Sequence, residues 1–496
     1  MFVVHPNTMK AMDQLTLERL NISSFQLMYR AGTALFDQIL KTIKPHQHAK
    51  FLILCGPGNN GGDALVIAQK LHEIKQQVSV WMLFPNVNPT DETKAALKAL
   101  DSNISVTQLN PSNTEEMYRL INATDYIVDG IFGIGKIRPV EGRLKTIIET
   151  INKSQATTIS IDIPSGLSAA NGLIKGAAII ADYTLIVQAY KIGNLLHQAK
   201  DCSKKNILVN VGIVTDIDQP KHELLTTNKN LKIPSRKHFS HKYNYGNTLV
   251  VGGHKTMPGA PQMAALAALR TGSGLASLAV RENERMYFLN TANEILVKSY
   301  DSNPTDLLGN YHSYVFGPGF GKEVGNKEVL IALLDDEVPL IIDGDGIALI
   351  SEVNIPKNDK AIIITPHVGE FAKLIGKTTQ DVLEDTTHLL IDFTKKYPIW
   401  VLLKGPTTII AENGNLYFVE AGNPGLAKAG SGDVLSGVIA TCVMKNLSTL
   451  NALELAVNIH GKAADLTEEQ FGEEGYLASD VIQNLPKAVA LYKPSK

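Results

Sequence analysis

Residues 51–63 read FLILCGPGNNGGD, a short apolar run that passes directly into a glycine-rich segment. A continuous apolar run is typical of a strand that is buried on both faces of a parallel sheet. Residues 64–74 have helical patterning, and residues 78–83 form a second apolar run. Strand, glycine-rich loop, helix and strand in this order predict a βαβ unit, which binds nucleotides at the carboxyl ends of its strands.

The glycine-rich loop lacks both the GxGxxG spacing of dinucleotide-binding proteins and the lysine of a Walker motif. It offers backbone N–H groups and polar side chains, which can bind phosphate, ribose hydroxyls or a hard cation. Two later strands end in similar segments, DGIFGIG at 129–135 and SIDIPSGL at 160–167. Each segment alone is better explained as a turn than as a site. Three such ends at one edge of a parallel sheet favour a ligand site.

The second half repeats the alternation of strands and helices. Its apolar runs end in GPGFG at 317–321, DGDGI at 343–347, TPHVGEF at 365–371 and LKGPTT at 403–408. A hairpin is expected around residues 412–414, and helices are expected at 431–445, 449–468 and 478–492. The pattern predicts a second parallel sheet covered by helices.

A glycine-rich loop at residues 430–432 opens the first of these helices. Backbone N–H groups and the helix dipole at such a terminus form a cradle for phosphate. Asp433 follows in the first turn, where it either caps the helix or contacts a bound substrate. A lone loop of this kind would favour the structural explanation, so the upstream motifs decide between the two.

The chain has 496 residues, more than one hydrophobic core usually serves, so two or more domains are expected. Residues 214–244 are polar, with little apolar periodicity, and we interpret them as a linker with an approach segment. The expected domains are residues 1–220 and 230–496, with the boundary near 220–230.

The formal net charge is −2, so no overall field favours nucleic acid or a membrane as a partner. No apolar stretch approaches the ~20 residues of a membrane span, and the first residues lack the basic segment of a signal peptide. Cys55, Cys202 and Cys442 lack metal-ligand spacing and are expected to be buried thiols in a reducing compartment. A cytoplasmic protein is therefore expected.

In the first half, GPGNNGGD, DGIFGIG and SIDIPSGL closely resemble the motifs of the NAD(P)H-hydrate epimerases, over residues 1–215. The resemblance implies an N-terminal Rossmann-like three-layer α/β domain. It implies K⁺ ligation by Asn60, Asp129 and Ser165, and Asp162 as the catalytic acid or base that contacts the damaged nicotinamide ring. It also implies a set of dinucleotide-binding residues, namely Asn59, Asn60, Gly61, Gly62, Asp63, Gly133, Ile134, Gly135, Lys136, Ile137, Arg138 and Pro139.

In the second half, PGAP, ALRTGSGLAS, GPGFG, TPHVGEF, LKGPTT and NPGLAKAGSGDVLSG closely resemble the nucleotide-dependent NAD(P)H-hydrate dehydratases, over residues 235–490. The resemblance implies a C-terminal ribokinase-like α/β domain that uses Mg²⁺ with ADP or ATP. Asp433 would be the catalytic residue that acts on the hydrate. Ala260, Gly319 and His367 would contact the hydrated dinucleotide, and the adenine nucleotide would be bound by Lys404, Gly405, Pro406, Thr407, Thr408 and Gly432.

The chain departs from these families at a few positions. Ala64 stands where the first family often has Gly, and Ile134 stands where Thr is common. Neither removes a proposed ligand, although both can alter loop geometry. Lys428 replaces a common Thr of the second family, and residues 343–347 replace its common Asp-Ala-Asp-Ala-Leu. Asp343 is a further candidate for positioning magnesium or nucleotide.

Several of these residues also have plainer explanations. His367 follows a proline and can cap the next helix, although its motif-like loop favours ligand contact. Asp343 and Asp345 are explained equally well as turn residues. Lys404 ends a buried strand, which favours nucleotide binding over simple solvation. His460 lies on an apolar helix face and is expected in the core.

The two resemblances together predict repair of NADH and NADPH hydrated at the nicotinamide ring, called NADHX and NADPHX. The first domain would interconvert the R and S epimers, and the second would dehydrate the S epimer with ADP or ATP, ADP being suggested for a fused chain. Two other classes stay open. One is a vitamin or sugar kinase with a nucleotide-sensing first domain, and the other is a non-catalytic binding module in the first half. A homo-oligomer is also expected.

Overall fold

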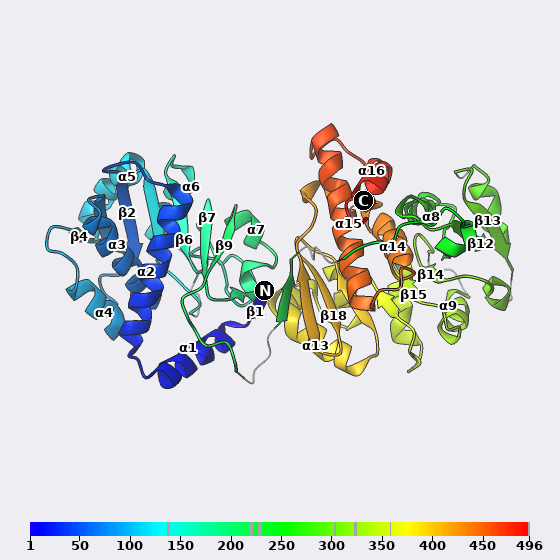
Figure 1. Cartoon of the computed structure of the whole chain (residues 1–496), viewed down its shortest axis with the longest axis horizontal. Coiled ribbons are helices and arrows are strands. Elements are labelled where there is room, and N and C mark those ends of the chain that lie inside the picture. The colour runs from blue at the N-terminus through cyan, green and yellow to red at the C-terminus, as the bar shows by residue number, and fades with distance from the viewer. Residues whose placement is uncertain are drawn as a thin grey trace. The chain divides into compact units, whose positions relative to one another are not determined.

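The computed structural model of the chain describes residues 1–135, 139–217, 222–226, 231–290, 292–301, 304–321, 325–357 and 359–494. It divides into two compact units, unit 1 at Met1–His222 and unit 2 at Glu223–Lys496 (Figure 1). Each unit has its own sheet of mainly parallel strands with helices on both faces.

Within the described residues, unit 1 contains a parallel sheet of seven strands in the order β4-β3-β2-β5-β6-β7-β9. The chain runs outward from β2 to β4 and then returns to place β5 on the other side of β2. Doubly wound sheets bind ligands at this switch point. The strands are β2 (Lys50–Cys55), β3 (Gln77–Met82), β4 (Ser105–Gln108), β5 (Tyr126–Gly130), β6 (Thr157–Ile161), β7 (Tyr183–Val187) and β9 (Asn206–Val209), and a short parallel pair joins β1 (Phe2–Val4) to β8 (Tyr190–Lys191).

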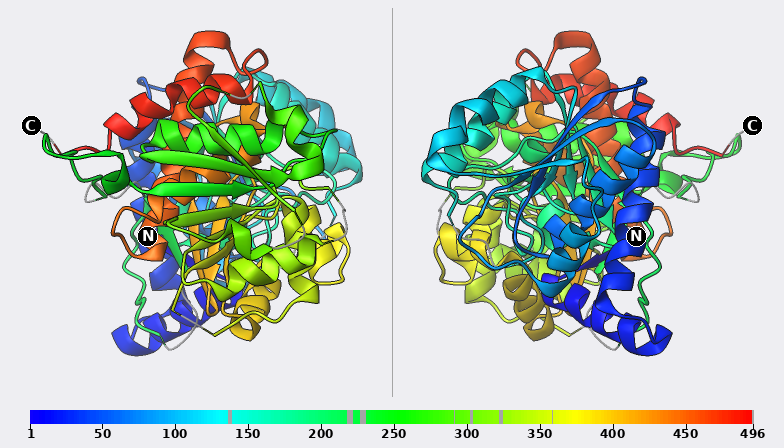
Figure 2. Two further views of the ribbon diagram at one scale, coloured as in Figure 1. Left: turned by 90° about the vertical axis from the view of Figure 1, so that its right-hand side faces the viewer. Right: turned by 90° about the vertical axis from the view of Figure 1, so that its left-hand side faces the viewer.

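Alternate residues of β2 pack into two different cores, because successive strand side chains point to opposite faces. Phe51 and Ile53 pack with α1 (Pro6–Leu20), α2 (Ser24–Ile43), α3 (Asn59–Glu73) and α4 (Asp91–Lys98). Leu52 and Leu54 pack with α5 (Thr114–Ala123) and α6 (Gly142–Lys153). The two helical layers flank the sheet in the right-hand view of Figure 2.

The glycine-rich segment after β2 differs from the prediction. Helix α3 begins at Asn59, with Gly58 as its N-cap, so the residues from Asn59 to Asp63 form its first turn rather than a loop. A Cβ on Gly61 would lie 2.1 Å from the Gly56 carbonyl oxygen, so only glycine permits the helix to start this close to the strand. The N–H groups at the helix start therefore face the edge of the sheet.

Within the described part of unit 2, strands follow the order β13-β12-β11-β14-β15-β16-β17-β18-β19-β10. They are parallel except β18, which is antiparallel to β17 and to β19 and forms the predicted hairpin. The strands are β10 (His222–Leu225), β11 (Asn247–Val251), β12 (Leu275–Arg281), β13 (Leu296–Tyr300), β14 (Ser313–Phe316), β15 (Leu340–Ile342), β16 (Ile362–Ile364), β17 (Trp400–Leu403), β18 (Thr408–Glu412) and β19 (Asn415–Val419).

Strand β10 lies inside the segment that was interpreted as a linker, so that interpretation is wrong there. Residues 223–225 pair in parallel with residues 417–419 of β19. A stretch this short carries no readable alternation of its own. It is a strand because the hairpin leaves an edge with which it can pair.

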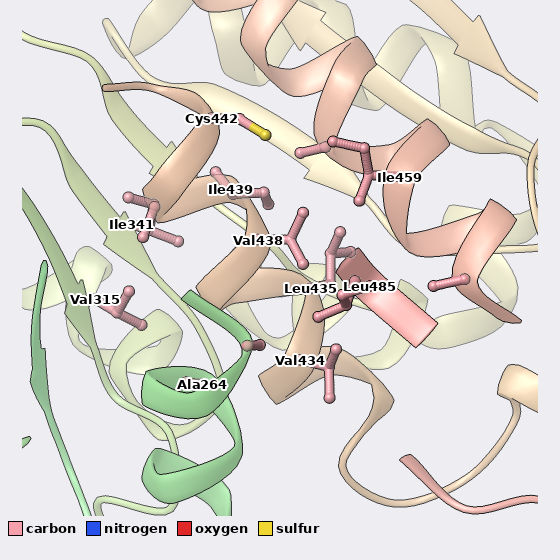
Figure 3. Packing of buried hydrophobic residues seen from close by; sticks show 14 of the residues in the cluster. Ala264, Val315, Ile341, Val434, Leu435, Val438, Ile439, Cys442, Ile459 and Leu485 are labelled. Atoms are coloured by element: carbon pink, nitrogen blue, oxygen red, sulfur yellow. The ribbon is translucent and has the colours of Figure 1, made fainter. Parts of the chain in front are cut away.

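Helix α14 (Ser431–Cys442) is the centre of the unit 2 core. Its apolar side chains, among them Val434 and Val438, pack with Ala264, Ile341 and Ile459 (Figure 3). Those partners come from α8 (Gly259–Thr271), β15 and α15 (Thr449–Phe471), and α16 (Ala478–Ala490) joins the same layer. The opposite face carries α9 (Asn326–Asp335), α10 (Asp345–Ala348), α11 (Val368–Leu374), α12 (Thr379–Glu384) and α13 (Thr386–Lys396) (Figure 2, left).

The three cysteines are buried free thiols, as predicted. Burial raises the pKa of Cys202 and of Cys442 to about 12, and it raises the pKa of Cys55 further. Such thiols are poor nucleophiles, which supports a packing role for Cys55. No helix among the described residues has both the length and the apolar character needed to cross a membrane.

Candidate functional site

A cavity of about 810 Å³ opens at the carboxyl ends of the unit 1 strands. Its walls come from the segments after β2, β5 and β6 and from α1 and α2. Eight predicted residues line it: Asn59, Asn60, Asp63, Gly133, Ile134, Gly135, Pro139 and Asp162. Gly61 and Gly62 are buried in the first turn of α3 behind this wall. Lys136, Ile137 and Arg138 lie outside the described residues.

Asp129 and Ser165 form a buried cluster beside the cavity. The Ser165 hydroxyl donates to Asp129 Oδ1 at 2.5 Å, and the Ser165 N–H donates to Oδ2 at 2.9 Å. Ser160 donates to the same carboxylate at 2.7 Å. Asn60 joins the cluster through Phe132, whose carbonyl accepts from Asn60 Nδ2 at 2.8 Å and whose N–H donates to the Ser165 hydroxyl at 2.9 Å.

The charge of Asp129 has no cationic partner in the described part of the chain, although its oxygens are well hydrogen-bonded. Burial raises the pKa of Asp129, and the bonds from Ser165 and Ser160 oppose that rise. A buried carboxylate of this kind is stabilised by any cation that binds next to it.

Asp162 is held in an unusual backbone conformation at the end of β6. Its φ of +66° lies in the left-handed region that non-glycine residues rarely adopt. Its Oδ1 accepts from the Val187 N–H at 2.9 Å and also contacts the ammonium of Lys191. Lys191 is fully buried and donates to the Ala189 carbonyl as well, at 2.9 Å. The surrounding structure therefore fixes this carboxylate at the cavity wall.

Sequence reasoning missed four charged residues at this site, Lys10, Asp13, Glu141 and Lys191, of which two interact with Asp162. Asp13 lines the cavity from α1, and Lys191 pairs with Asp162 from the segment after β7. Asp13 stands in an amphipathic helix where a polar residue is unremarkable. Lys191 is buried, which is unusual for lysine. The signal available in the sequence was a lysine only four residues after the apolar run of β7.

In unit 2, four segments converge on the start of α14. The Nζ atom of Lys404, after β17, lies 3.0 Å from Asp343 Oδ1, after β15, and 3.8 Å from Glu370 Oε2. A Cβ on Gly432 would lie 3.1 Å from that Nζ atom. Asp433 follows in the first turn of α14, whose N-cap is Gly430 with φ +91°. The helix starts at Ser431, as predicted, so Ser431 and Gly432 belong to its first turn.

Burial and the neighbouring carboxylates raise the pKa of Asp433. Burial, followed by the charge of Asp343, raises the pKa of Asp433 to about 7, while Lys404 opposes the shift. Burial by itself would lower the pKa of Lys404, but Asp343, Glu370 and Asp433 outweigh it, so that pKa is raised. Lys404 therefore stays charged, and Asp433 can exchange a proton near neutral pH.

Three buried polar atoms near these residues have no hydrogen-bond partner in the described structure. They are Thr407 Oγ1, Ser431 Oγ and His460 Nε2. Burial, then the charge of Lys404, lowers the pKa of His460 to about 4, so its ring is neutral at physiological pH. His460 is buried, as expected, but its Nε2 atom lacks a hydrogen-bond partner in the described structure. Unpaired buried groups of this kind fit a site that a polar ligand completes.

The remaining predicted residues of unit 2 occupy its loops. His367 caps α11, since its Nδ1 accepts from the N–H groups of Gly369 at 3.0 Å and of Glu370 at 3.3 Å. Gly319 has φ +58°, and a Cβ there would lie 3.1 Å from the Ala260 Cβ. Asp345 accepts from the Gly321 N–H at 2.8 Å and so fixes the loop after β14. Residues 404–407 connect β17 to β18, and Thr408 is the first residue of β18.

Known proteins match both units. Residues 24–193 match the family described as YjeF-related protein N-terminus, and residues 248–487 match NAD(P)H-hydrate dehydratase. A bifunctional NAD(P)H-hydrate repair enzyme of Thermofilum pendens is 30% identical, over 99% of this chain and 96% of its own. The chain belongs to the bifunctional NAD(P)H-hydrate repair enzymes. A Coxiella burnetii protein with the same description is 31% identical, over 98% of this chain and 99% of its own.

Membership of this repair-enzyme family confirms the resemblance drawn from the motifs of both halves, and the α/β fold class with it. Among solved structures, an ADP/ATP-dependent NAD(P)H-hydrate dehydratase of Bacillus subtilis, co-crystallized with ATP/Mg²⁺, is 26% identical. It has a TM-score of 0.49 and covers 53% of this chain and 95% of its own.

Two departures from the usual repair-enzyme motifs have a structural account. Lys428 donates to the carbonyls of Glu474 at 2.6 Å and Tyr476 at 2.7 Å, so it ties the loop before α14 to the segment before α16. A Cβ on Gly130 would lie 2.5 Å from the Ala64 methyl, so the methyl fills space beside a glycine of β5. Neither side chain is a ligand of the clusters described above.

Proposed function

We propose that the chain repairs NADHX and NADPHX, with residues 1–220 interconverting the R and S epimers and residues 230–496 dehydrating the S epimer. One observation carries the proposal: a family of bifunctional repair enzymes covers the whole chain, and each unit holds its own carboxylate at the ligand-binding edge of its sheet. These carboxylates are Asp162 and Asp433. The substrates are the hydrated dinucleotides and ADP or ATP, with ADP preferred.

In unit 2, Asp433 acts as a base. Hydroxide is a poor leaving group, so the hydroxyl must first be converted to a phosphate ester. Asp433 takes the hydroxyl proton as that oxygen attacks the terminal phosphate and displaces the shortened nucleotide. Phosphate then leaves with the C–O electron pair, and the neighbouring ring carbon loses a proton, so that its C–H pair forms the double bond that restores the ring. A pKa near 7 suits a base at neutral pH. The free N–H groups at the start of α14 stabilise the charge that develops on the phosphoryl oxygens.

The nucleotide is bound by residues 404–408 and Gly432, next to Asp433. Lys404 is held by Asp343 and Glu370 and supplies the positive charge for the phosphates. Thr407 and Ser431, from the two segments that would bind the nucleotide, have buried hydroxyl groups without hydrogen-bond partners in the described structure, and a nucleotide would satisfy them. Ala260, Gly319 and His367 contact the hydrated dinucleotide.

The described residues contain no group of three or more His, Cys, Asp or Glu side chains arranged to hold a metal. Asp343 and Asp345 are also engaged with Lys404 and Gly321. This arrangement fits Mg²⁺ that is held mainly through nucleotide phosphates and water, with at most one or two carboxylates. Bound there, Mg²⁺ would offset the charge of the phosphates.

In unit 1, Asp162 moves the proton needed to interconvert the epimers. The Val187 N–H and Lys191 fix its carboxylate at the cavity wall, which fits a group that must be positioned accurately. The dinucleotide is held by the first turn of α3 (Asn59, Asn60, Gly61, Gly62, Asp63) and by residues 133–139.

The residues proposed for K⁺ fit that ion by their chemistry. Asn60, Asp129 and Ser165 offer amide, carboxylate and hydroxyl oxygens, which suit a hard cation, and Phe132 links the three through its backbone. Asn60 Oδ1 accepts no hydrogen bond from the described residues. The charge of Asp129 also lacks a partner there. K⁺ would neutralise this charge and fix the segments after β2, β5 and β6. The proposal places the enzyme in the cytoplasm.

The decisive experiment adds ADP or ATP to the S hydrate and follows the return of reduced-nicotinamide absorbance, while chromatography or NMR follows R to S interconversion. Asp433→Asn should abolish dehydration and leave interconversion intact, and Asp162→Asn should do the reverse. Asp392→Asn and Asp37→Asn change exposed carboxylates of units 2 and 1 and should alter neither activity. Phosphorylation of a thiazole or sugar alcohol, with no reaction of the hydrate, would instead identify a small-molecule kinase.

A further inference from the structure

The cavity of unit 1 has a second carboxyl group that none of the predicted roles uses. Met9, Lys10, Asp13 and Leu17 line it, and their spacing places them on one face of α1. The helix is anchored beside Asp13, because the Thr16 hydroxyl, one turn further along, donates to the Met12 carbonyl at 2.7 Å and accepts from the Val214 N–H at 2.8 Å. Helix α1 therefore presents Asp13 to the cavity as a fixed group.

Asp13 and Asp162 share the cavity but have different surroundings. Asp162 is bound to a backbone N–H and to Lys191. Asp13 makes no hydrogen bond or ion pair with any residue in the described part of the chain, and apolar side chains such as Leu27 and Met28 also line the cavity. Two carboxyl groups in contrasting environments are the usual arrangement for an acid and a base acting at one site.

The charges around Asp13 favour its protonated form. Burial, then the negative charge of Asp162, raises the pKa of Asp13 to about 7, and Lys191 opposes the shift. Lys10, Asp63 and Glu141 also line the cavity. Burial raises the pKa of Asp63 well above its ordinary value, with further contributions from Asp162 and Asp13. Asp13, with its pKa near 7, can release and regain a proton at neutral pH.

We propose that Asp13 is a second catalytic residue of unit 1, which protonates the hydroxyl that leaves the hydrated ring while Asp162 accepts the proton from the water that returns. This inference rests on the proposed interconversion of the R and S hydrates. It gives the cavity an acid on α1 and a base at the end of β6.

The step balances without any oxidant or reductant. The hydroxyl stands on a carbon bonded to the ring nitrogen. The Asp13 proton moves to that hydroxyl, the C–O bond breaks with its electron pair going to the departing water, and the nitrogen lone pair forms a C=N bond. Water then attacks the opposite face, the π electrons return to nitrogen, and its proton passes to Asp162. Solvent carries that proton back to Asp13.

The test uses the full chain and measures R to S interconversion by chromatography or NMR, with an enzyme-free blank subtracted. Asp13→Asn should lower kcat by about 100-fold or more, as loss of a general acid does, and should leave KM within about threefold. Asp13→Glu keeps the carboxyl group and should retain more activity than Asp13→Asn. Asp37→Asn is the matched exposed control on α2 and should behave as wild type.

Two readouts separate an acid from a structural residue. Wild-type kcat/KM should fall above about pH 7 as Asp13 loses its proton, and Asp13→Asn should lack this limb of the profile. Added formate should partly restore Asp13→Ala by entering the space that the side chain leaves. Emission from Trp81, which is buried in β3 of unit 1, checks the folding of each variant when Trp400 of unit 2 is replaced by Phe.

An Asp13→Asn enzyme that keeps more than about a tenth of kcat, or loses activity only through KM, overturns the role of Asp13. So does Asp13→Ala that is folded, inactive and insensitive to formate. If wild type itself does not exceed the blank, the proposed interconversion fails, and the role of Asp13 fails with it. An active wild type beside an active Asp13→Asn rejects the Asp13 inference alone.

Discussion

The ammonium of Lys404 and the carboxylate of Asp343 lie 3.0 Å apart, joining the end of β17 to the end of β15. Asp343 is only 2% exposed, and Lys404 is its ion-pair partner. Asp343 is therefore more than a turn residue, because it also holds the Lys404 ammonium. The pair places one positive charge at the start of α14, and the carboxylates of Asp343, Glu370 and Asp433 surround that charge. Together these charges and burial hold the pKa of Asp433 at about 7.

The first prediction concerns Lys404→Met, which removes the positive charge but keeps much of the side-chain length. A hydrogen bond to a charged group is worth about 1.5–3 kcal/mol, so the KM for ADP in the dehydration assay should rise by about 10-fold or more. Lys462→Met on α15 removes a half-exposed lysine that faces Asp465 instead, and it should leave this KM unchanged. Equal KM values for Lys404→Met and Lys462→Met would rule out phosphate binding by Lys404.

The second prediction is a pH profile for dehydration. Asp433 must be ionised to act as a base, and its pKa is raised to about 7, so the rate at low substrate concentrations should rise as pH passes through 7. The charge of Asp343 contributes to that raised pKa, so Asp343→Asn should move the rise to lower pH. Asp392→Asn should leave the midpoint in place. A profile that is flat between pH 6 and 8 (about two units around this pKa) would contradict the assignment of Asp433 as base.

The sequence predicted most of the fold because buried parallel strands are mainly apolar runs that end in a polar or glycine-rich segment. The strands β2, β5, β6, β15 and β16 were all read in this way. β10 was missed because its partner, the edge of the β18–β19 hairpin, lies almost 200 residues away in the chain, from Glu223 to Tyr417. Strand identity there depends on tertiary pairing rather than on local pattern.

The sites were predicted less completely, because some of their residues come from segments that are distant in the sequence from the motifs. The motifs identify residues that follow strands, such as Asn60 and Asp162. They give no information on side chains that reach the same cavity from elsewhere. Asp13 arrives from an N-terminal helix, and Lys191 arrives from a segment after β7. His367 shows the converse, because a motif residue with a proposed ligand role also caps its own helix.

The third prediction compares two glycines of the segment after β2. A Cβ on Gly61 would lie 2.1 Å from the Gly56 carbonyl oxygen, which is too close for any side chain. A Cβ on Gly58 would have no atom within 4 Å, and the residue has φ −88°. Gly61→Ala should therefore destabilise unit 1 by about 1–3 kcal/mol through overpacking, and Gly58→Ala should cost well under about 1 kcal/mol.

Urea unfolding followed by Trp81 emission, in a Trp400→Phe background that removes the tryptophan of unit 2, measures this difference within unit 1. The two substitutions are three residues apart and chemically identical, so each controls for the other. Equal midpoints would show that the start of α3 tolerates a side chain at Gly61. Glycine would then not be required for the close approach of β2 and α3.

The fourth prediction concerns K⁺ in unit 1. If Asp129 with Asn60 and Ser165 binds the ion, K⁺ binds the folded unit and not the unfolded chain, so KCl should raise its Tm above that in LiCl at equal ionic strength. Asp129→Asn removes the charge that attracts the ion but keeps the shape of the side chain, so it should abolish the difference in Tm between KCl and LiCl. The same variant should lose any K⁺ dependence of R to S interconversion. Asp37→Asn should keep both effects. Equal Tm values for the wild type in the two salts would argue that the Asp129 charge is stabilised by its hydrogen bonds alone, from Ser160, Ser165 and the Ile131 N–H.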